Sequence, residues 1–213
     1  MPLFKTISIP DGLIGLWKFA ETSDDLLPYF SVDDLDDPAF LKYTHEKRKV
    51  EWLATRVLIS QIIGPKFSIS YLNSGKPILK HDQFKYISIS HSRDFAAVIL
   101  HEHLNVGIDI EETTRDYNRI EKRYLSDIEI SQTDKNPQLQ CLYWCAKEAI
   151  FKLVDDEGIE FRQQIHIIPE PENQYFAKFI SGDQESSYKL HHQFISEHCL
   201  VWVTNESIIQ ELQ

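Results

Sequence analysis

The chain has 213 residues, and its 42% hydrophobic and 12% aromatic content supports a buried core and argues against disorder. The formal net charge of −11 argues against general nucleic-acid binding, because such a surface repels phosphate backbones. We find no membrane-spanning apolar run and no secretory signal. The three cysteines form no CxxC pair, which fits a reduced cytoplasmic protein better than a disulfide framework or a zinc knuckle.

Charge is distributed unevenly over the first quarter of the chain. Segment 21–37 contains seven acidic residues and no lysine or arginine, whereas segment 42–56 contains five basic residues and two acidic ones. A local basic patch on an acidic protein suits a small polyanionic ligand better than a long polymer. A solvated helix face would give the same pattern, so charge alone leaves both interpretations open.

A helix, or two helices end to end, is predicted between Asp37 and Gly64. Asp37-Pro38 fits an N-cap followed by proline at the first helical position, and Gly64-Pro65 would end the helix. We expect Arg48 and Arg56 to lie off the buried stripe, whose members recur at helical spacing: Val50, Leu53, Ala54, Val57, Leu58 and Ile62.

Extended segments follow this helix. Residues 86–90 alternate between apolar and polar, residues 95–100 form a short apolar run, and residues 91–94 between them fit a hairpin turn. Residues 106–110 form a further apolar segment. These patterns predict three consecutive strands.

A second long helix is predicted to begin at Asn136-Pro137, with Gly158 as its C-cap. Its core stripe consists of Leu139, Leu142, Tyr143, Ala146, Ile150 and Leu153, and a different face carries Cys141, Cys145, Glu148 and Lys152. Four short strands are expected after it, around 164–168, 175–180, 189–194 and 199–204, with turns at 173 and 181–183.

The order of these elements repeats once along the chain. We therefore predict an α+β fold of two similar halves, residues 1–104 and 105–213, each an antiparallel sheet packed against a long helix. Without a flexible linker the halves should pack closely. The cleft between them is the expected ligand site.

Two acidic residues stand at alternate positions of the third predicted strand. Asp109 and Glu111 would project from the same face and repel each other, and a divalent cation with oxygen ligands would neutralise them. Magnesium commonly takes one or two protein carboxylates together with substrate phosphates. A strand end that enters solvent would also explain the pattern.

Two charged residues of the second helix lie on one face. Glu148 and Lys152 are separated by four positions, so a helix-stabilising ion pair is one interpretation. The alternative is functional: Glu148 would be a metal ligand or a general base, and Lys152 a phosphate contact.

Ser90-His91-Ser92 occupies a predicted turn, and Gly75-Lys76-Pro77 precedes it. A histidine between two hydroxyl residues can donate a hydrogen bond to a phosphate. Each tripeptide on its own would equally suit an ordinary surface turn.

Taken together and in order, these motifs resemble a known signature. Gly-Lys-Pro, Ser-His-Ser, Val-Gly-Ile-Asp-Ile-Glu and Trp-x-x-Lys-Glu-Ala-x-x-Lys, over residues 75–152, are similar to the phosphopantetheinyl transferases. The Sfp-type class is the closer match. The resemblance implies a monomer whose two halves are related by a pseudo-twofold, with coenzyme A in the cleft between them.

The resemblance also implies roles for individual residues. Magnesium would be held by Asp109, Glu111 and Glu148, and Lys152 would contact the diphosphate of coenzyme A. The 3′-phosphate end would lie near Lys76 and His91, with Ser90 a weaker candidate. Arg48 matches an arginine that contacts phosphate, while Arg56 could equally be structural. The supporting residue Lys147 completes the Lys-Glu pair.

The implied reaction transfers phosphopantetheine from coenzyme A to a serine hydroxyl of an acyl or peptidyl carrier protein and releases 3′,5′-ADP, with Glu148 as the base. Carrier docking is expected around Arg115, Arg119, Lys122 and Arg123, with apolar contact from Tyr117 and Tyr124. A catalytically inactive coenzyme A or nucleotide-binding module on the same fold is the alternative, and a metal-dependent phosphoesterase is a weaker one. The carrier and its pathway, the metal used in the cell and tolerance for acyl-coenzyme A stay open.

Overall fold

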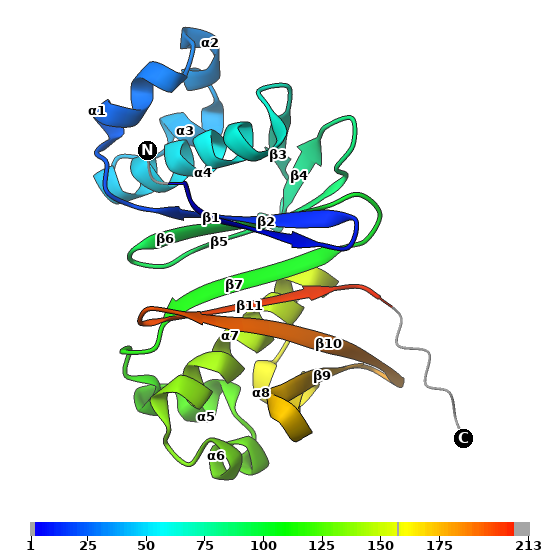
Figure 1. The fold of residues 1–213 in the computed structure, drawn as a ribbon. Helices are drawn as coiled ribbons and strands as arrows, with labels where there is room; N and C mark the ends of the chain where they lie inside the picture. The colour runs from blue at the N-terminus through cyan, green and yellow to red at the C-terminus, as the bar shows by residue number, and fades with distance from the viewer. Residues whose placement is uncertain (1–2, 157, 207–213) are drawn as a thin grey trace.

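The computed structural model describes residues 3–156 and 158–206 (Figure 1). Its first sheet has four antiparallel strands in the order β1-β2-β6-β5. The strands are β1 (Leu3–Ile9), β2 (Gly12–Lys18), β5 (Tyr86–His91) and β6 (Phe95–His101).

Helical segments and a small hairpin lie between β2 and β5. They are α1 (Ser23–Leu26), the 3₁₀ turn η1 (Leu27–Tyr29), α2 (Val32–Leu35), α3 (Pro38–Leu41), α4 (Glu46–Ile63), β3 (Ser68–Tyr71) and β4 (Pro77–Lys80). The acidic segment supplies two capping boxes, because Asp25 and Asp34 bond back to Thr22 and Ser31. These two aspartates of the acidic segment therefore stabilise the N-termini of α1 and α2.

The second sheet has five antiparallel strands in the order β7-β11-β10-β9-β8. Its strands are β7 (Val106–Glu112), β8 (Ile165–Glu170), β9 (Gln174–Ser181), β10 (Gln184–Ile195) and β11 (His198–Thr204). The helical segments are η2 (Tyr117–Arg119), α5 (Glu121–Tyr124), α6 (Asp127–Thr133), α7 (Pro137–Val154), α8 (Phe161–Gln164) and η3 (Pro171–Asn173).

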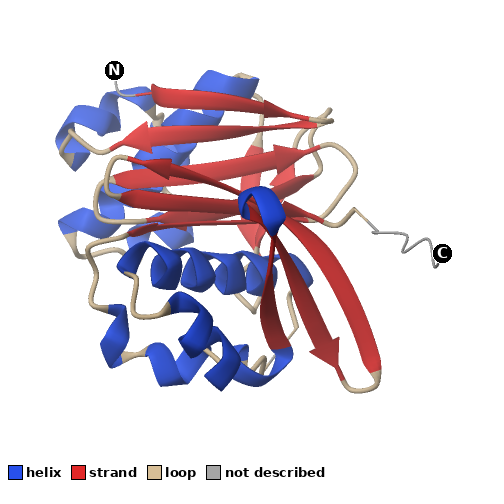
Figure 2. Ribbon diagram, turned by 60° about the horizontal axis from the view of Figure 1, so that its bottom comes forward, coloured by secondary structure: helices blue, strands red, loops and turns tan. Residues whose placement is uncertain are grey.

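Three apolar clusters arrange these elements in layers. One packs α4 on the first sheet, and another packs α7 on the second. The third joins the inner faces of the two sheets through residues such as Leu16, Ile99, Ile108 and Leu200. Helices therefore lie on both sides of the strands (Figures 1 and 2).

These observations confirm the predicted α+β class with antiparallel sheets. The boundary placed after residue 104 lies between β6 and β7, with one sheet on each side of it. The division into two domains and the pseudo-twofold stay predictions. No helix among the described residues is long and apolar enough to cross a membrane.

Two local predictions were wrong. The C-cap of α7 is Asp155, in the left-handed conformation at φ 52°, and not Gly158. Arg56 is buried, at 8% exposure, because α3 and the preceding segments cover the outer face of α4. Every residue of α4 from Val50 to Ile59 is buried as a result.

Candidate functional site

The centre of the site is β7, whose two faces differ. Val106, Ile108 and Ile110 pack between the sheets, so Asp109 and Glu111 face α7. Gly107 permits this arrangement: a β-carbon there would lie 1.9 Å from the carbonyl oxygen of Ala149 on α7. The helix that carries Glu148 and Lys152 therefore rests directly on the strand that carries the first two carboxylates.

Asp109 is the most enclosed acid of the site, with 5% exposure. Its Oδ1 accepts hydrogen bonds from Ser90 Oγ and from Lys152 Nζ, each at 2.7 Å. Its Oδ2 is buried and has no hydrogen-bond partner among the described residues. Lys152 thus forms its ion pair with Asp109. The helix-stabilising ion pair between Glu148 and Lys152, one of the two interpretations of the sequence, does not form in the part of the chain that the structure describes.

Glu111 and Glu148 are destabilised as anions. Burial, and then repulsion by Asp109, raises the pKa of each carboxyl to about 7. Glu111 pairs with Arg115 at 3.1 Å, while Glu148 has no hydrogen bond or ion pair to any described residue. Such a carboxyl can gain or lose a proton near neutral pH.

The three carboxylates do not converge closely: no set of one oxygen from each lies within 4.8 Å of one another in the described structure. Lys152 holds Asp109 on one side and Arg115 holds Glu111 on the other. The group nevertheless fits magnesium chemically. All three donors are hard oxygens, Oδ2 of Asp109 is buried and unpartnered, and the two raised pKa values report a deficit of positive charge.

Two adjoining cavities lie close to this acidic group, and Lys152 connects them to it because it lines one of them and bonds to Asp109. The first, of about 440 Å³, lies between the 74–77 turn with β5 on one side and the end of α7 on the other, and Lys76 and Lys152 line it. The second, of about 220 Å³, is lined by Arg48, Arg56 and His91. The two share Gly75, Pro77 and Ile89, and we call them together the basic groove.

His91 lies inside the basic groove. Its Nε2 is 2.8 Å from Thr55 Oγ1, and its ring stacks on Phe19. Burial, with the nearby charges of Lys152 and Arg48, lowers the pKa of His91 to about 3. The imidazole is therefore neutral at physiological pH until an anion enters.

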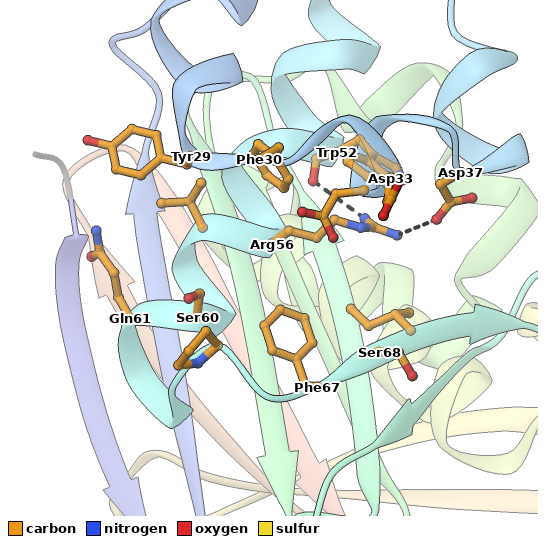
Figure 3. Close-up of a pocket in the computed structure, with 14 residues that line it drawn as sticks. Tyr29, Phe30, Asp33, Asp37, Trp52, Arg56, Ser60, Gln61, Phe67 and Ser68 are labelled. Atoms are coloured by element: carbon orange, nitrogen blue, oxygen red, sulfur yellow. Dashed lines mark hydrogen bonds and ion pairs between the residues drawn. The ribbon is translucent and has the colours of Figure 1, made fainter.

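Arg56 separates the basic groove from a further cavity of about 560 Å³, because it lines both (Figure 3). Its guanidinium lies 3.4 Å from the ring centroid of Trp52 and 3.8 Å from Asp37. Nη2 is buried and has no hydrogen-bond partner among the described residues. Nη1 donates to the Trp52 carbonyl oxygen at 3.4 Å. Burial lowers the pKa of Arg56, against opposing contributions from Tyr71 and Asp37.

Ser90 is not among the residues that line the basic groove. It is buried, donates to Asp109 and accepts from the Ile110 amide at 3.4 Å. Ser88, which the sequence analysis did not single out, accepts from the Ile108 amide at 3.2 Å. The two hydroxyls join β5 to the free edge of β7. In the sequence, the two serines stand at alternate positions of one predicted strand, and this pattern could have identified Ser88 together with Ser90.

Lys147 has a structural environment. Its fully buried ammonium donates to Glu129 at 2.7 Å and to the carbonyl oxygens of Tyr124 and Phe161 at 2.6 and 3.0 Å. Glu129 also accepts from the Ile167 amide. This network ties α5, α6, α8 and β8 to α7, which agrees with the supporting role given to Lys147.

A third cavity, of about 640 Å³, opens on the other side of Glu148. Its lining includes four cations: Arg115, Lys122, Arg123 and Arg162. Arg119 is exposed and pairs with Asp116 at 2.9 Å. Tyr117 and Tyr124 are each only 1% exposed, so the expectation that they offer a docking contact was wrong; they pack beneath this surface.

Comparison with known proteins identifies the C-terminal region. Residues 105–203 match the model of the 4′-phosphopantetheinyl transferase superfamily. A 4′-phosphopantetheinyl transferase of Escherichia coli K12, AcpT, is 31% identical over 115 residues, which is 49% of this chain and 57% of that protein. AcpT of Salmonella typhimurium is 33% identical over 81 residues, 38% of this chain and 42% of that protein.

The chain thus spans between about two fifths and three fifths of the length of these curated relatives. The matched region contains β7, α7 and every carboxylate of the site. Residues 105–203 are therefore similar to the 4′-phosphopantetheinyl transferase superfamily.

Proposed function

We propose that this protein transfers the 4′-phosphopantetheine group of coenzyme A to a serine hydroxyl of an acyl or peptidyl carrier protein. The observation that carries the proposal is the position of Asp109. It lies between Ser90 and Lys152 with one oxygen unpartnered, beside two carboxyls of raised pKa, and Lys152 links it to the basic groove that this lysine lines.

Asp109, Glu111 and Glu148 would hold a magnesium ion, the cation that the family uses. When bound, magnesium supplies positive charge to the phosphoryl oxygens and the leaving group. The remaining functions belong to the chain's own side chains.

The basic groove would bind coenzyme A by its phosphates. Lys152 lies nearest the carboxylates and would contact the diphosphate, while Lys76, His91, Arg48 and Arg56 would surround the 3′-phosphate end. Ser90 would act by positioning Asp109, since its hydroxyl bonds to that carboxylate and not into the groove.

Glu148 would serve as the general base. Burial and Asp109 raise its pKa to about 7 in the metal-free chain, and a bound magnesium ion would lower that pKa and keep the carboxylate ionised to accept the serine proton. Glu148 also lines the cavity of about 640 Å³ from which a carrier could approach. The serine oxygen then attacks the β-phosphorus of coenzyme A, its bond to phosphorus forms as the bond to the leaving oxygen breaks, and 3′,5′-ADP departs.

The decisive experiment incubates the protein with coenzyme A, Mg²⁺ and an apo-carrier, followed by mass spectrometry of the carrier. Addition of the phosphopantetheine mass is expected. Asp109→Ala and Glu148→Ala should each lower the rate by at least about 100-fold. Glu112→Gln is the matched control, because its carboxylate pairs with Arg93 at 3.2 Å. Binding of coenzyme A without transfer would favour the inactive-module alternative, and hydrolysis of coenzyme A without a carrier would favour the phosphoesterase.

Carrier docking is proposed at the cationic cavity beside Glu148. The carrier proteins on which this family acts are usually acidic. The basic residues of this cavity would locally offset the net charge of −11 of the chain. The double variant Arg119→Glu, Arg123→Glu should raise the KM for carrier and leave coenzyme A affinity unchanged. An unchanged KM would remove this surface from the proposal. We further propose a cytoplasmic monomer.

A further inference from the structure

All three cysteines of the chain meet at one point in the interior. The sequence contains Cys141, Cys145 and Cys199 and no other cysteine, and each is 0% exposed. Their three sulfur atoms lie within 4.8 Å of one another. We call this group the thiol cluster. Proximity in the chain does not account for it, because Cys199 is 54 positions from Cys145.

The fold directs each thiol inward from a rigid element. Cys141 and Cys145 are four residues apart on α7 and share one face of the helix. On β11, Cys199 belongs with Val201 and Val203 to the cluster under α7, whereas Leu200 faces the other sheet. Two turns of a helix and one strand thus supply the three sulfurs.

The spacing suits a coordinated ion. With metal–sulfur bonds of about 2.3 Å, a planar three-coordinate site places its sulfurs about 4.0 Å apart. All three sulfur atoms lie within 4.8 Å of one another here, so at most a contraction of about 0.8 Å separates them from that arrangement. Thiolates select soft cations over the hard magnesium ion proposed for the carboxylates.

The surroundings also suit a metal. In the described structure the thiols interact with one another and make long contacts to two carbonyl oxygens, with Cys141 Sγ 3.6 Å from that of Glu111 and Cys145 Sγ 3.5 Å from that of Cys199. The Tyr117 hydroxyl lies 3.2 Å from Cys141 Sγ and 3.0 Å from the Glu112 carbonyl oxygen, so its single proton is within reach of the cluster but shared with that carbonyl. A donor at this position would stabilise the negative charge of three thiolates around a divalent ion.

We propose that Cys141, Cys145 and Cys199 bind a thiophilic d¹⁰ cation of the zinc and cadmium class. Each thiol that coordinates the ion releases its proton to solvent, so no oxidant is required. The ion links α7 to β11, and Cys199 pairs across the sheet with Glu111 of β7. Its role is structural: it fixes the helix against the strands that carry the carboxylates.

The test uses the full chain, reduced and kept without oxygen, with Cd²⁺ as the probe. We expect one Cd²⁺ per chain in native mass spectrometry, a sulfur-to-cadmium charge-transfer absorption, and a ¹¹³Cd chemical shift typical of sulfur ligands. Cys141→Ala, Cys145→Ala and Cys199→Ala should each weaken binding at least tenfold while far-UV circular dichroism stays unchanged. Cd²⁺ should also raise the Tm of the wild-type chain.

His191→Ala with His192→Ala is the control for scattered binding of Cd²⁺ to imidazoles, because the two histidines lie outside the thiol cluster on β10. It should leave the charge-transfer absorption intact. The proposal is overturned if the wild-type chain gives no such absorption, or if the cysteine variants bind Cd²⁺ as tightly as it does. Should a variant fail to fold, the ¹¹³Cd shift of the wild-type chain decides alone: a shift typical of nitrogen and oxygen ligands rejects the site. These readouts are independent of transferase activity.

Discussion

The helices α4 and α7 each span 18 residues and each carry a buried cation, yet the two cations are treated differently. Lys147 on α7 donates to three acceptors within 3.0 Å and has no exposed surface. Arg56 on α4 lies on Trp52 with its nearest carboxylate at 3.8 Å and leaves Nη2 without a hydrogen-bond partner among the described residues.

The difference separates a structural cation from one that can bind a ligand. An ammonium has three N–H donors, and those of Lys147 have three acceptors, so nothing remains for a ligand. A guanidinium has five, and Arg56 lines two cavities with donors to spare. For these two cations, the hydrogen bonds left unmade distinguish Arg56, proposed to bind a ligand, from Lys147.

Removal of Lys147, the buried cation whose hydrogen bonds are complete, should have the largest effect on stability. Lys147→Ala leaves the Glu129 carboxylate buried and uncompensated, so the free energy of unfolding should fall by about 3–5 kcal/mol in guanidinium chloride titrations. The double variant Lys147→Met, Glu129→Gln should recover part of the loss. A loss below about 1 kcal/mol for Lys147→Ala would contradict this account.

The unsatisfied cation should show the opposite pattern. Arg56→Met keeps an apolar side chain near Trp52 and removes the guanidinium, so coenzyme A should bind about 10- to 100-fold more weakly in calorimetry, while stability changes little. Lys47→Met removes the same charge from α4 at an exposed position outside the groove and is the control. Equal affinity of Arg56→Met and wild type would make Arg56 structural.

The basic groove predicts a pH effect through His91. Its folded pKa of about 3 lies below the ordinary value of 6.5, so the unfolded chain binds the proton first as the pH falls. Stability should therefore decline from about pH 6.5 downwards, and less steeply in His91→Gln. Urea titrations at about pH 7.5 and 5.5 measure this difference. Saturating 3′,5′-ADP should flatten the wild-type decline, because a phosphate raises the pKa of His91; a decline unaffected by the substitution would refute the assignment.

The smallest effect is expected at an exposed ion pair, which tests whether contact distance or burial determines the contribution of an ion pair to stability. Arg162 and Asp127 approach to 2.6 Å, as closely as Lys147 and Glu129 at 2.7 Å, but Asp127 is 90% exposed. Asp127→Asn should change the free energy of unfolding by less than about 1 kcal/mol in the same guanidinium chloride titration. A loss as large as that of Lys147→Ala would show that the contact distance, and not burial, decides the comparison.

Features encoded locally were predictable from the sequence. Asn136 accepts from the amides of Gln138 and Leu139 and caps α7 as its position before proline indicates. The alternation of residues 106–111 correctly placed Asp109 and Glu111 on one face of a strand. Gly158 was chosen as the C-cap because glycine favours positive φ, but aspartate also tolerates that conformation, and Asp155 comes first.

Features created by distant packing were not predictable. Arg56 appeared exposed from its helical phase, and only the covering by segments that precede α4 buries it. The hairpin of β1 and β2 was not located, although its register with β6 completes the first sheet. The thiol cluster depends on where β11 returns in space, which the spacing of three cysteines does not reveal.

The approach of α7 to β7 at Gly107 has a consequence for the evolution of this site. The separation of the two elements is fixed by a missing side chain, because even one methyl group would collide with the main chain of Ala149. Neighbouring residues cannot relieve that collision by changing rotamer, since the obstructing atoms belong to the helix backbone. The distance between strand and helix therefore cannot be adjusted gradually by substitutions at this position.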